Sequence, residues 1–185
     1  MRVIAGSAKG MKLKRPSGIS IRPTSDRVKE ALFSIIGGNL IGSTFVDLYA
    51  GSGAIGIEAI SRGVDNCIFV DNDKNSINLI NENLDKTKLK NKGRVIFADA
   101  KKALLQMEKE NTEADIIFLD PPYNITNLRE ILTSLLNSTI LSAEGLIVVE
   151  HDRKNHNWID SLPVTKQKVY GDTCLSFFCL KTKEN

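Results

Sequence analysis

The sequence lacks the features that mark membrane, secreted and zinc-binding proteins. No apolar run approaches the roughly 20 residues of a membrane-spanning helix, and the segment MRVIAGSAKG has no apolar signal-peptide core. The three cysteines show no CxxC spacing, and the two histidines form no metal-ligand pattern with them. We therefore expect a cytoplasmic protein with buried thiols and no metal.

The chain is also too short for two comfortable domains and contains no repeat, low-complexity tract or linker. Its 185 residues, 42% hydrophobic and 25% charged, are typical of one folded domain. We expect a single domain over 1–185, acting as a monomer. Within it, 1–40 form a basic extension and 41–185 form the core.

Positive charge is concentrated at the start of the chain. The net charge is +3, yet residues 1–30 carry eight Lys or Arg against two acids, so the remaining residues are mildly acidic. This distribution favours a segment that contacts a polyanion, although a solvated surface would explain charge alone. The eight cations are Arg2, Lys9, Lys12, Lys14, Arg15, Arg22, Arg27 and Lys29.

Short β-prone pieces and one amphipathic helix are expected in the basic extension. RVIAG and MKLKR flank a turn-like SAKG, which predicts a small β-hairpin. In TSDRVKEALFSIIGG the apolar residues recur at helical spacing behind the possible caps Thr24, Ser25 and Asp26. Gly37 and Gly38 would end this helix.

From Thr44 onward, apolar strands alternate with amphipathic helices. This order predicts an α/β fold with a mostly parallel sheet covered on both faces. VTKQKVY, Gly171-Asp172 and TCLSFFCLK then predict an antiparallel hairpin at the edge of the sheet. The predicted parallel strands are TFVDLYA, NCIFVD, RVIFAD, ADIIFLD and GLIVVE, with helices beginning near Ala54, Asp73, Ala100 and Asn127.

A glycine-rich loop follows the first of these strands. In VDLYAGSGAIG, Gly51, Gly53 and Gly56 satisfy GxGxxG, a weak signal that serves dinucleotide and S-adenosylmethionine enzymes alike. Asp47 lies four residues before the first glycine in an otherwise apolar strand. A buried acid is costly without a donor, and it would repel dinucleotide phosphates but attract the ammonium of S-adenosylmethionine. The loop therefore favours the methyl donor.

Acids also end the next two strands. Asp71 can accept hydrogen bonds from adenosine ribose hydroxyls. Asp73 is its rival, but it fits better as the cap of the helix DKNSINLI. Asp99 could accept from an adenine amino group, cap the helix AKKALLQM, or do both.

The fourth strand ends in the motif DPPY. It could be only a stiff turn, since Pro121 and Pro122 restrict the backbone. The carboxylate of Asp120 and a proline-held carbonyl can also accept both hydrogens of an exocyclic amine, turning its lone pair outward. Tyr123 can stack on the ring that carries the amine.

These motifs together resemble a known family. DPPY with DLYAGSG resembles amino-methyltransferases of nucleobases, and MRVIAGSAKGMKLKRP with IRPTSDRVKEALFSII resembles the RsmD family of bacterial 16S rRNA guanine-966 N2 methyltransferases. The resemblance covers nearly the whole chain. It implies a Rossmann-like class I methyltransferase with seven strands, S-adenosylmethionine as donor, and a guanine in the 30S subunit or its precursor as target. The family often has glutamate where this chain has Asp71.

The resemblance also assigns the candidate residues. Asp120, Pro121, Pro122 and Tyr123 would hold the target amine. The donor site would comprise Asp47, Gly51, Ser52, Gly53, Asp71, Asp99 and Ala100. Contacts with RNA would come from Arg2, Lys9, Lys12, Arg22, Arg27 and Lys29.

Three alternatives remain. An adenine-N6 DNA methyltransferase would share DPPY, but the chain has no target-recognition region. A nicotinamide-dependent oxidoreductase is disfavoured by Asp47, and a non-catalytic RNA-binding module is disfavoured by the intact Asp120 and Tyr123.

Overall fold

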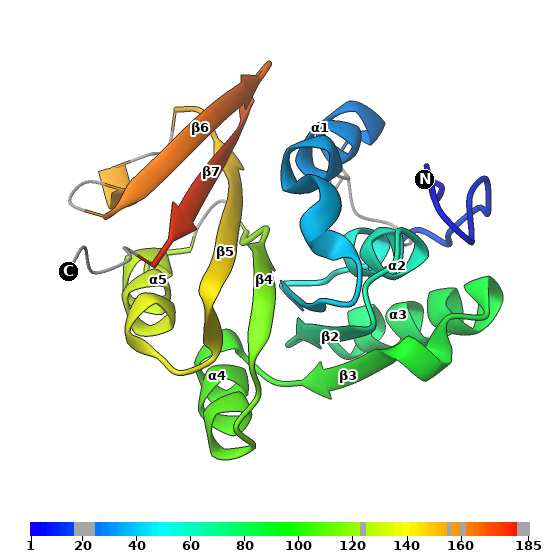
Figure 1. Ribbon diagram of the computed structural model, residues 1–185. Coiled ribbons are helices and arrows are strands. Elements are labelled where there is room, and N and C mark those ends of the chain that lie inside the picture. The colour runs from blue at the N-terminus through cyan, green and yellow to red at the C-terminus, as the bar shows by residue number, and fades with distance from the viewer. Residues whose placement is uncertain (17–24, 123–124, 155–156, 160–161, 181–185) are drawn as a thin grey trace.

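Seven strands form one sheet with helices on both faces, as the sequence predicts (Figure 1). The computed structural model describes residues 1–16, 25–122, 125–154, 157–159 and 162–180. The strand order is β3-β2-β1-β4-β5-β7-β6. Strands β1 to β5 pair in parallel, β7 is antiparallel to β5, and β6 is antiparallel to β7.

The predicted alternation of elements is confirmed, with small changes in their bounds. β5 begins four residues earlier than GLIVVE suggested, and the β4–β5 register shifts between Ala114 and Ile116. The strands are β1 (Thr44–Leu48), β2 (Asn66–Asp71), β3 (Gly93–Phe97), β4 (Ala114–Leu119), β5 (Leu141–Asp152), β6 (Val164–Tyr170) and β7 (Thr173–Cys179). The α-helices are α1 (Asp26–Ile36), α2 (Ala54–Ser61), α3 (Lys74–Thr87), α4 (Ala100–Lys109) and α5 (Leu128–Asn137), and the 3-10 helices are η1 (Gly37–Leu40), η2 (Lys90–Lys92) and η3 (Asn157–Ile159).

The ends of α1 follow the predicted capping chemistry. The Ser25 hydroxyl accepts a hydrogen bond from the Val28 N–H at 3.2 Å, which satisfies a backbone donor that has no partner within the helix. Gly37 ends the helix with a φ of 61°, which glycine adopts without steric cost. The helix begins at Asp26, immediately after the cap.

Each face of the sheet has its own hydrophobic core. The α1-side core contains buried residues of α1, α2 and α3, and the α4-side core contains those of α4 and α5. Successive strand residues alternate between the two cores, so Phe45 belongs to the first and Val46 to the second. Asp47 therefore projects toward the side that α2 occupies.

The predicted reversal of the chain at the N-terminus is confirmed, but it is shorter than a two-stranded β-hairpin. Residues 1–16, here named the N-terminal basic segment, contain no strand and only one antiparallel bridge, between Arg2 and Lys12. The Val3 N–H still donates to the Met11 carbonyl at 3.0 Å, so the chain does fold back on itself. Contacts with Glu58 and Asn83 also hold this segment.

Among the helices that the structure describes, none is long and apolar enough to cross a membrane. The same part of the chain contains no cluster of three His, Cys, Asp or Glu that could hold a metal ion. Cys67, Cys174 and Cys179 are all free thiols, the first two buried and the third half-buried. Burial raises the pKa of the Cys67 thiol and makes it a weak nucleophile.

Candidate donor and target site

The loop between β1 and α2 has the backbone shape that its glycines permit. Gly51 and Gly53 have φ values of 55° and 75°. A side chain at Gly56 would begin 2.3 Å from the Phe69 ring, so this glycine allows α2 to pack tightly on β2. Tyr49 adopts a φ of 123°, a strained value for a non-glycine residue, directly before the loop. Tyr49 could not be identified from the sequence, because backbone strain is not visible in the order of amino acids.

Asp47 is buried beneath this loop. Its carboxylate accepts a hydrogen bond from the Gly56 N–H at 2.9 Å. Burial raises the pKa of Asp47 to about 7; the Gly56 hydrogen bond opposes the rise, and the negative charges of Asp120 and Asp71 add to it. The Asp47 carboxylate is thus hydrogen-bonded to a backbone amide. The acids at the ends of β2 and β4 are near enough to influence its charge.

The structure separates the roles of Asp71 and Asp73. One carboxylate oxygen of Asp71 accepts from the Gly51 N–H at 2.8 Å and the other from the Asp73 N–H at 2.9 Å. Asp73 is exposed and caps α3 by accepting from the Asn75 and Ser76 N–H groups, each at 3.2 Å. The capping role of Asp73 is confirmed, and Asp71 is the acid that contacts the glycine loop.

Asp99 caps α4, as one of its two predicted roles requires. It accepts from the Lys102 N–H at 3.0 Å, and its other oxygen lies 3.1 Å from the Lys102 ammonium. The backbone and side-chain hydrogen bonds from Lys102 lower the pKa of Asp99. Ala100 is buried as the first residue of α4. Burial raises the pKa of Tyr49 to about 12, and the negative charge of Asp99 adds to this rise.

The DPPY motif leaves the sheet at the same edge as these acids. Asp120 is exposed directly after β4, Pro121 is buried and Pro122 is exposed. The Pro122 carbonyl accepts from the Ile125 N–H at 3.0 Å, so the Pro121 carbonyl is the better candidate for a second acceptor beside Asp120. The predicted stacking residue, Tyr123, lies outside the described residues.

The prediction that Lys29 contacts RNA is wrong. Its side chain is 2% exposed, and its ammonium donates to the Arg2 carbonyl at 2.6 Å and lies 3.2 Å from the Glu58 carboxylate. Glu58, on α2, is fully buried and also accepts from the Ile4 and Ala5 N–H groups at 2.8 and 3.0 Å. Lys29 therefore fastens the N-terminal basic segment between α1 and α2.

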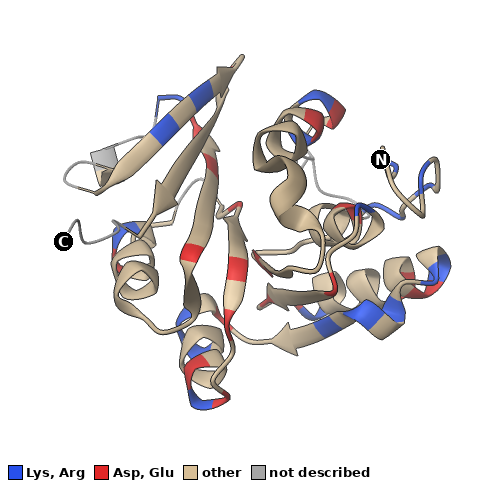
Figure 2. Ribbon diagram, viewed as in Figure 1, with Lys and Arg blue, Asp and Glu red and all other residues tan. Residues whose placement is uncertain are grey.

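The other predicted RNA contacts remain at the surface where the structure describes them. Lys9, Lys12 and Arg27 are exposed. Arg2 is exposed as well and forms an ion pair of 3.7 Å with Asp26. Arg22 lies outside the described residues. Figure 2 shows basic residues spread along the N-terminal end of the chain beside α1 and α2.

Asn83, which the sequence analysis missed, joins the basic segment to the glycine loop. Its fully buried side chain on α3 accepts from the Lys14 N–H at 2.7 Å and donates to the Ser52 carbonyl at 2.9 Å and the Lys14 carbonyl at 3.2 Å. Met1 also reaches the loop, because its sulfur lies 3.6 Å from the Ser52 hydroxyl. Loop and segment thus share one buried amide.

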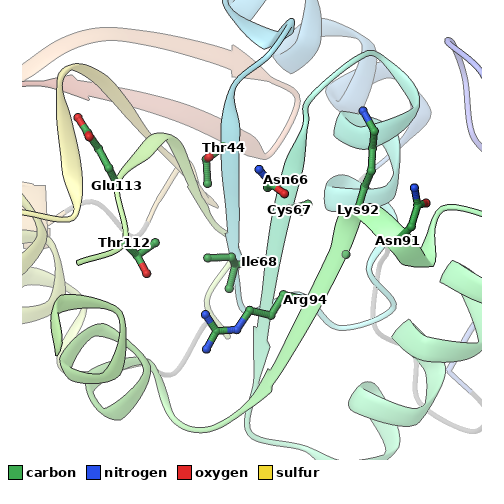
Figure 3. Close-up of a pocket in the computed structure, with 10 residues that line it drawn as sticks. Thr44, Asn66, Cys67, Ile68, Asn91, Lys92, Arg94, Thr112 and Glu113 are labelled. Carbon is green, nitrogen blue, oxygen red and sulfur yellow. The ribbon is translucent and has the colours of Figure 1, made fainter. Parts of the chain in front are cut away.

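The described residues also line a cavity of about 330 Å³, which lies far from this chemistry (Figure 3). It opens at the amino ends of β1, β2 and β3, opposite the edge that carries the acids. Arg94, one of its cations, is held by Glu110 through two hydrogen bonds of 2.6 and 2.8 Å. Parallel sheets bind ligands at the carboxyl ends of their strands, so we place the candidate site there.

Similar proteins match nearly the full length of the chain. A family model described as "Conserved hypothetical protein 95" matches residues 1–179. Bacillus subtilis YlbH is 42% identical over 180 residues, covering 96% of this chain and 98% of that protein. Escherichia coli ribosomal RNA small subunit methyltransferase D is 34% identical over 184 residues, covering 96% of this chain and 89% of that protein.

Solved structures share the same fold. The Thermus thermophilus hypothetical protein TTHA0928 matches with a TM-score of 0.83 and 29% identity, over 97% of this chain and 99% of that chain. A Salinibacter ruber RNA methyltransferase in complex with S-adenosyl-L-homocysteine matches with a TM-score of 0.69 and 13% identity, over 88% and 96%; this likeness concerns the fold alone. The fold is that of the class I S-adenosylmethionine-dependent methyltransferases, and the chain belongs to the RsmD family of ribosomal RNA methyltransferases.

Proposed function

We propose that this protein transfers a methyl group from S-adenosylmethionine to the exocyclic N2 amine of a guanine in 16S rRNA. By family resemblance the target is guanine-966 in the 30S subunit or its precursor, which places the enzyme in the cytoplasm. The observation that carries the proposal is that β1, which holds Asp47 and leads into the glycine loop, lies between β2 and β4, so Asp71 and Asp120 of DPPY leave the sheet at the same edge on either side of it. A target amine at DPPY would thus lie next to the candidate donor site.

The residues around the loop suit S-adenosylmethionine. A Cβ at Gly51 would meet no atom within 4 Å, so the loop leaves open space on that side. Asp47 and Asp71 offer negative charge and hydrogen-bond acceptors for an ammonium group and for ribose hydroxyls, and Asp99 with Ala100 begins the helix expected near the adenine. When bound, the donor supplies an electrophilic methyl group.

The protein's own contribution to the chemistry is to orient the amine. The Asp120 carboxylate and the Pro121 carbonyl would each accept one amine hydrogen, which turns the nitrogen lone pair toward the donor side. The same carboxylate stabilises the positive charge that develops on nitrogen. Tyr123 would stack on the flipped guanine. This scheme requires no strong base.

Exposed cations would bind the RNA backbone. Arg2, Lys9, Lys12 and Arg27 are available at the surface, Arg22 lies outside the described residues, and buried Lys29 is excluded from the predicted set. Contacts of this type position an RNA without reading its sequence. Selectivity would then depend on the shape of the rRNA in the assembling subunit.

The decisive experiment is transfer of labelled methyl to 30S subunits that lack the modification, followed by mapping of the modified nucleotide. Asp120→Ala should lower the rate about 100-fold, the usual cost of losing one group that stabilises transition-state charge, while S-adenosylhomocysteine binding stays near wild type. The matched control is Glu113→Gln, an exposed acid just before β4 at the opposite edge of the sheet. Methylation of duplex DNA but not of 30S subunits would refute the rRNA assignment.

A further inference from the structure

Two lysines of the edge strand β6 project from the sheet face that α1 covers. Lys166 lies opposite Phe177 of β7, and Lys168 lies opposite Leu175. Both β7 residues belong to the α1-side core, and opposed residues of an antiparallel pair project from the same face. Both lysines are exposed, and neither forms an ion pair with any acid in the part of the chain that the structure describes.

These lysines lie near the edge of the sheet that carries the target motif. Tyr170, the last residue of β6, pairs with Thr173, which in turn pairs with Asp152 at the end of β5. β6 therefore points toward the same edge as β4 and Asp120. Two strands separate β4 from β6, so at ~4.8 Å per strand the two are ~14 Å apart, and Lys168 lies ~7 Å back from the end of β6.

The N-terminal basic segment occupies the other side of the target motif. Figure 2 shows the basic residues of β6 and those of the N-terminal segment on opposite sides of α1. When the target base of an RNA lies at Asp120, the RNA backbone continues from that nucleotide in two directions. The N-terminal basic segment can neutralise phosphates on one side only, whereas Lys166 and Lys168 are placed to do so on the other.

We propose that Lys166 and Lys168 of β6 form a second phosphate-binding surface, which contacts the rRNA on the side of the target base opposite the N-terminal basic segment. The inference rests on the proposed function and extends it to a substrate contact on the C-terminal hairpin. The charges favour RNA as the occupant, because a surface lysine without an acidic partner can pair with a phosphate. A lysine that already pairs with an acid is less available to a polyanion. Lys14, for example, is held by Glu82 at 2.8 Å.

Lysines on an edge strand have another established use, which the experiment must separate from RNA binding. They prevent the open edge from pairing with a second molecule. Replacing them would then promote self-association and leave RNA affinity as it was. The two roles therefore differ in a measurable way.

The test is the double variant Lys166→Gln/Lys168→Gln, with equilibrium binding to unmodified 30S subunits measured over a series of salt concentrations. Each lost phosphate contact should reduce the slope of log affinity against log salt by ~0.7–0.9, so the slope should fall by ~1.4–1.8. S-adenosylhomocysteine binding should be unchanged. The control is Lys86→Gln/Lys109→Gln, which removes two exposed lysines from the last turns of α3 and α4 and should keep the wild-type slope; neither pairs with an acid among the residues that the structure describes.

Three outcomes would overturn the inference. The first is a wild-type slope and affinity in the β6 double variant, with or without self-association in sedimentation. The second is a weaker affinity with an unchanged slope, which would assign the lysines to a contact with a ribosomal protein. The third is the same loss of slope in the control. Failure of the proposed function is distinct, because the wild-type protein itself would then fail to methylate 30S subunits.

Discussion

Replacement of Glu58 by alanine should destabilise the protein and release its N-terminal basic segment. The carboxylate is fully buried, accepts hydrogen bonds from the Ile4 and Ala5 N–H groups and from the Arg62 Nε–H at 2.8 Å, and lies 3.2 Å from the Lys29 ammonium. Its removal leaves the 2% exposed Lys29 without a counter-charge. Loss of one partner from a buried ion pair costs about 3–5 kcal/mol. That is a large share of the roughly 5–15 kcal/mol typical of domain stability.

The stability assay is urea unfolding followed by circular dichroism. Glu58→Ala should lower the free energy of unfolding by about 4 kcal/mol, and Lys29→Met should lower it less, because Glu58 then keeps Arg62 and two backbone amides. Glu82→Ala is the control, since its pair with Lys14 is exposed and such pairs contribute under ~1 kcal/mol. A loss below about 1 kcal/mol in Glu58→Ala, or a larger loss in Lys29→Met, would refute this reasoning.

Three further predictions concern the site. Because burial raises the pKa of Asp47 to about 7, the contribution of Asp47 to stability is complete below pH ~4 and is lost as the pH rises through 7. The free energy of unfolding of the wild-type protein should therefore decline by up to ~4 kcal/mol between pH 4 and 8, and Asp47→Asn should flatten that decline. An unchanged decline in the variant would contradict this. Asn83→Ala should weaken binding of both S-adenosylhomocysteine and 30S subunits about 2- to 10-fold, because the Asn83 amide holds Ser52 and Lys14. If calorimetry shows neither effect, Asn83 does not couple the glycine loop to the N-terminal basic segment. Tyr123→Phe should retain far more methyl transfer than Tyr123→Ala, since stacking requires the ring; equal losses would point to the hydroxyl.

The elements of the fold and the acids at the strand ends were predictable because their signals are local. Apolar periodicity and capping residues act within a few positions, so the start of α1 after Ser25 and the capping by Asp73 and Asp99 matched expectation. The same locality explains why the N-terminal hairpin was predicted longer than it is. RVIAG and MKLKR have strand propensity and pair at one antiparallel bridge, but contacts with Glu58 and Asn83 also hold this segment.

The sequence by itself determined the order of strands and helices, the glycine loop, the acids at the strand ends and the family. Only the tertiary structure decided which polar side chains are buried and which distant groups they contact. Lys29 looks like any basic residue of an amphipathic helix, yet Glu58 makes it a buried anchor. Asn83 is one of several polar residues in the amphipathic segment NSINLINENLDK, yet it contacts Lys14 at a separation of 69 residues. Burial and pairing depend on groups brought together from distant parts of the chain, and no local pattern records them.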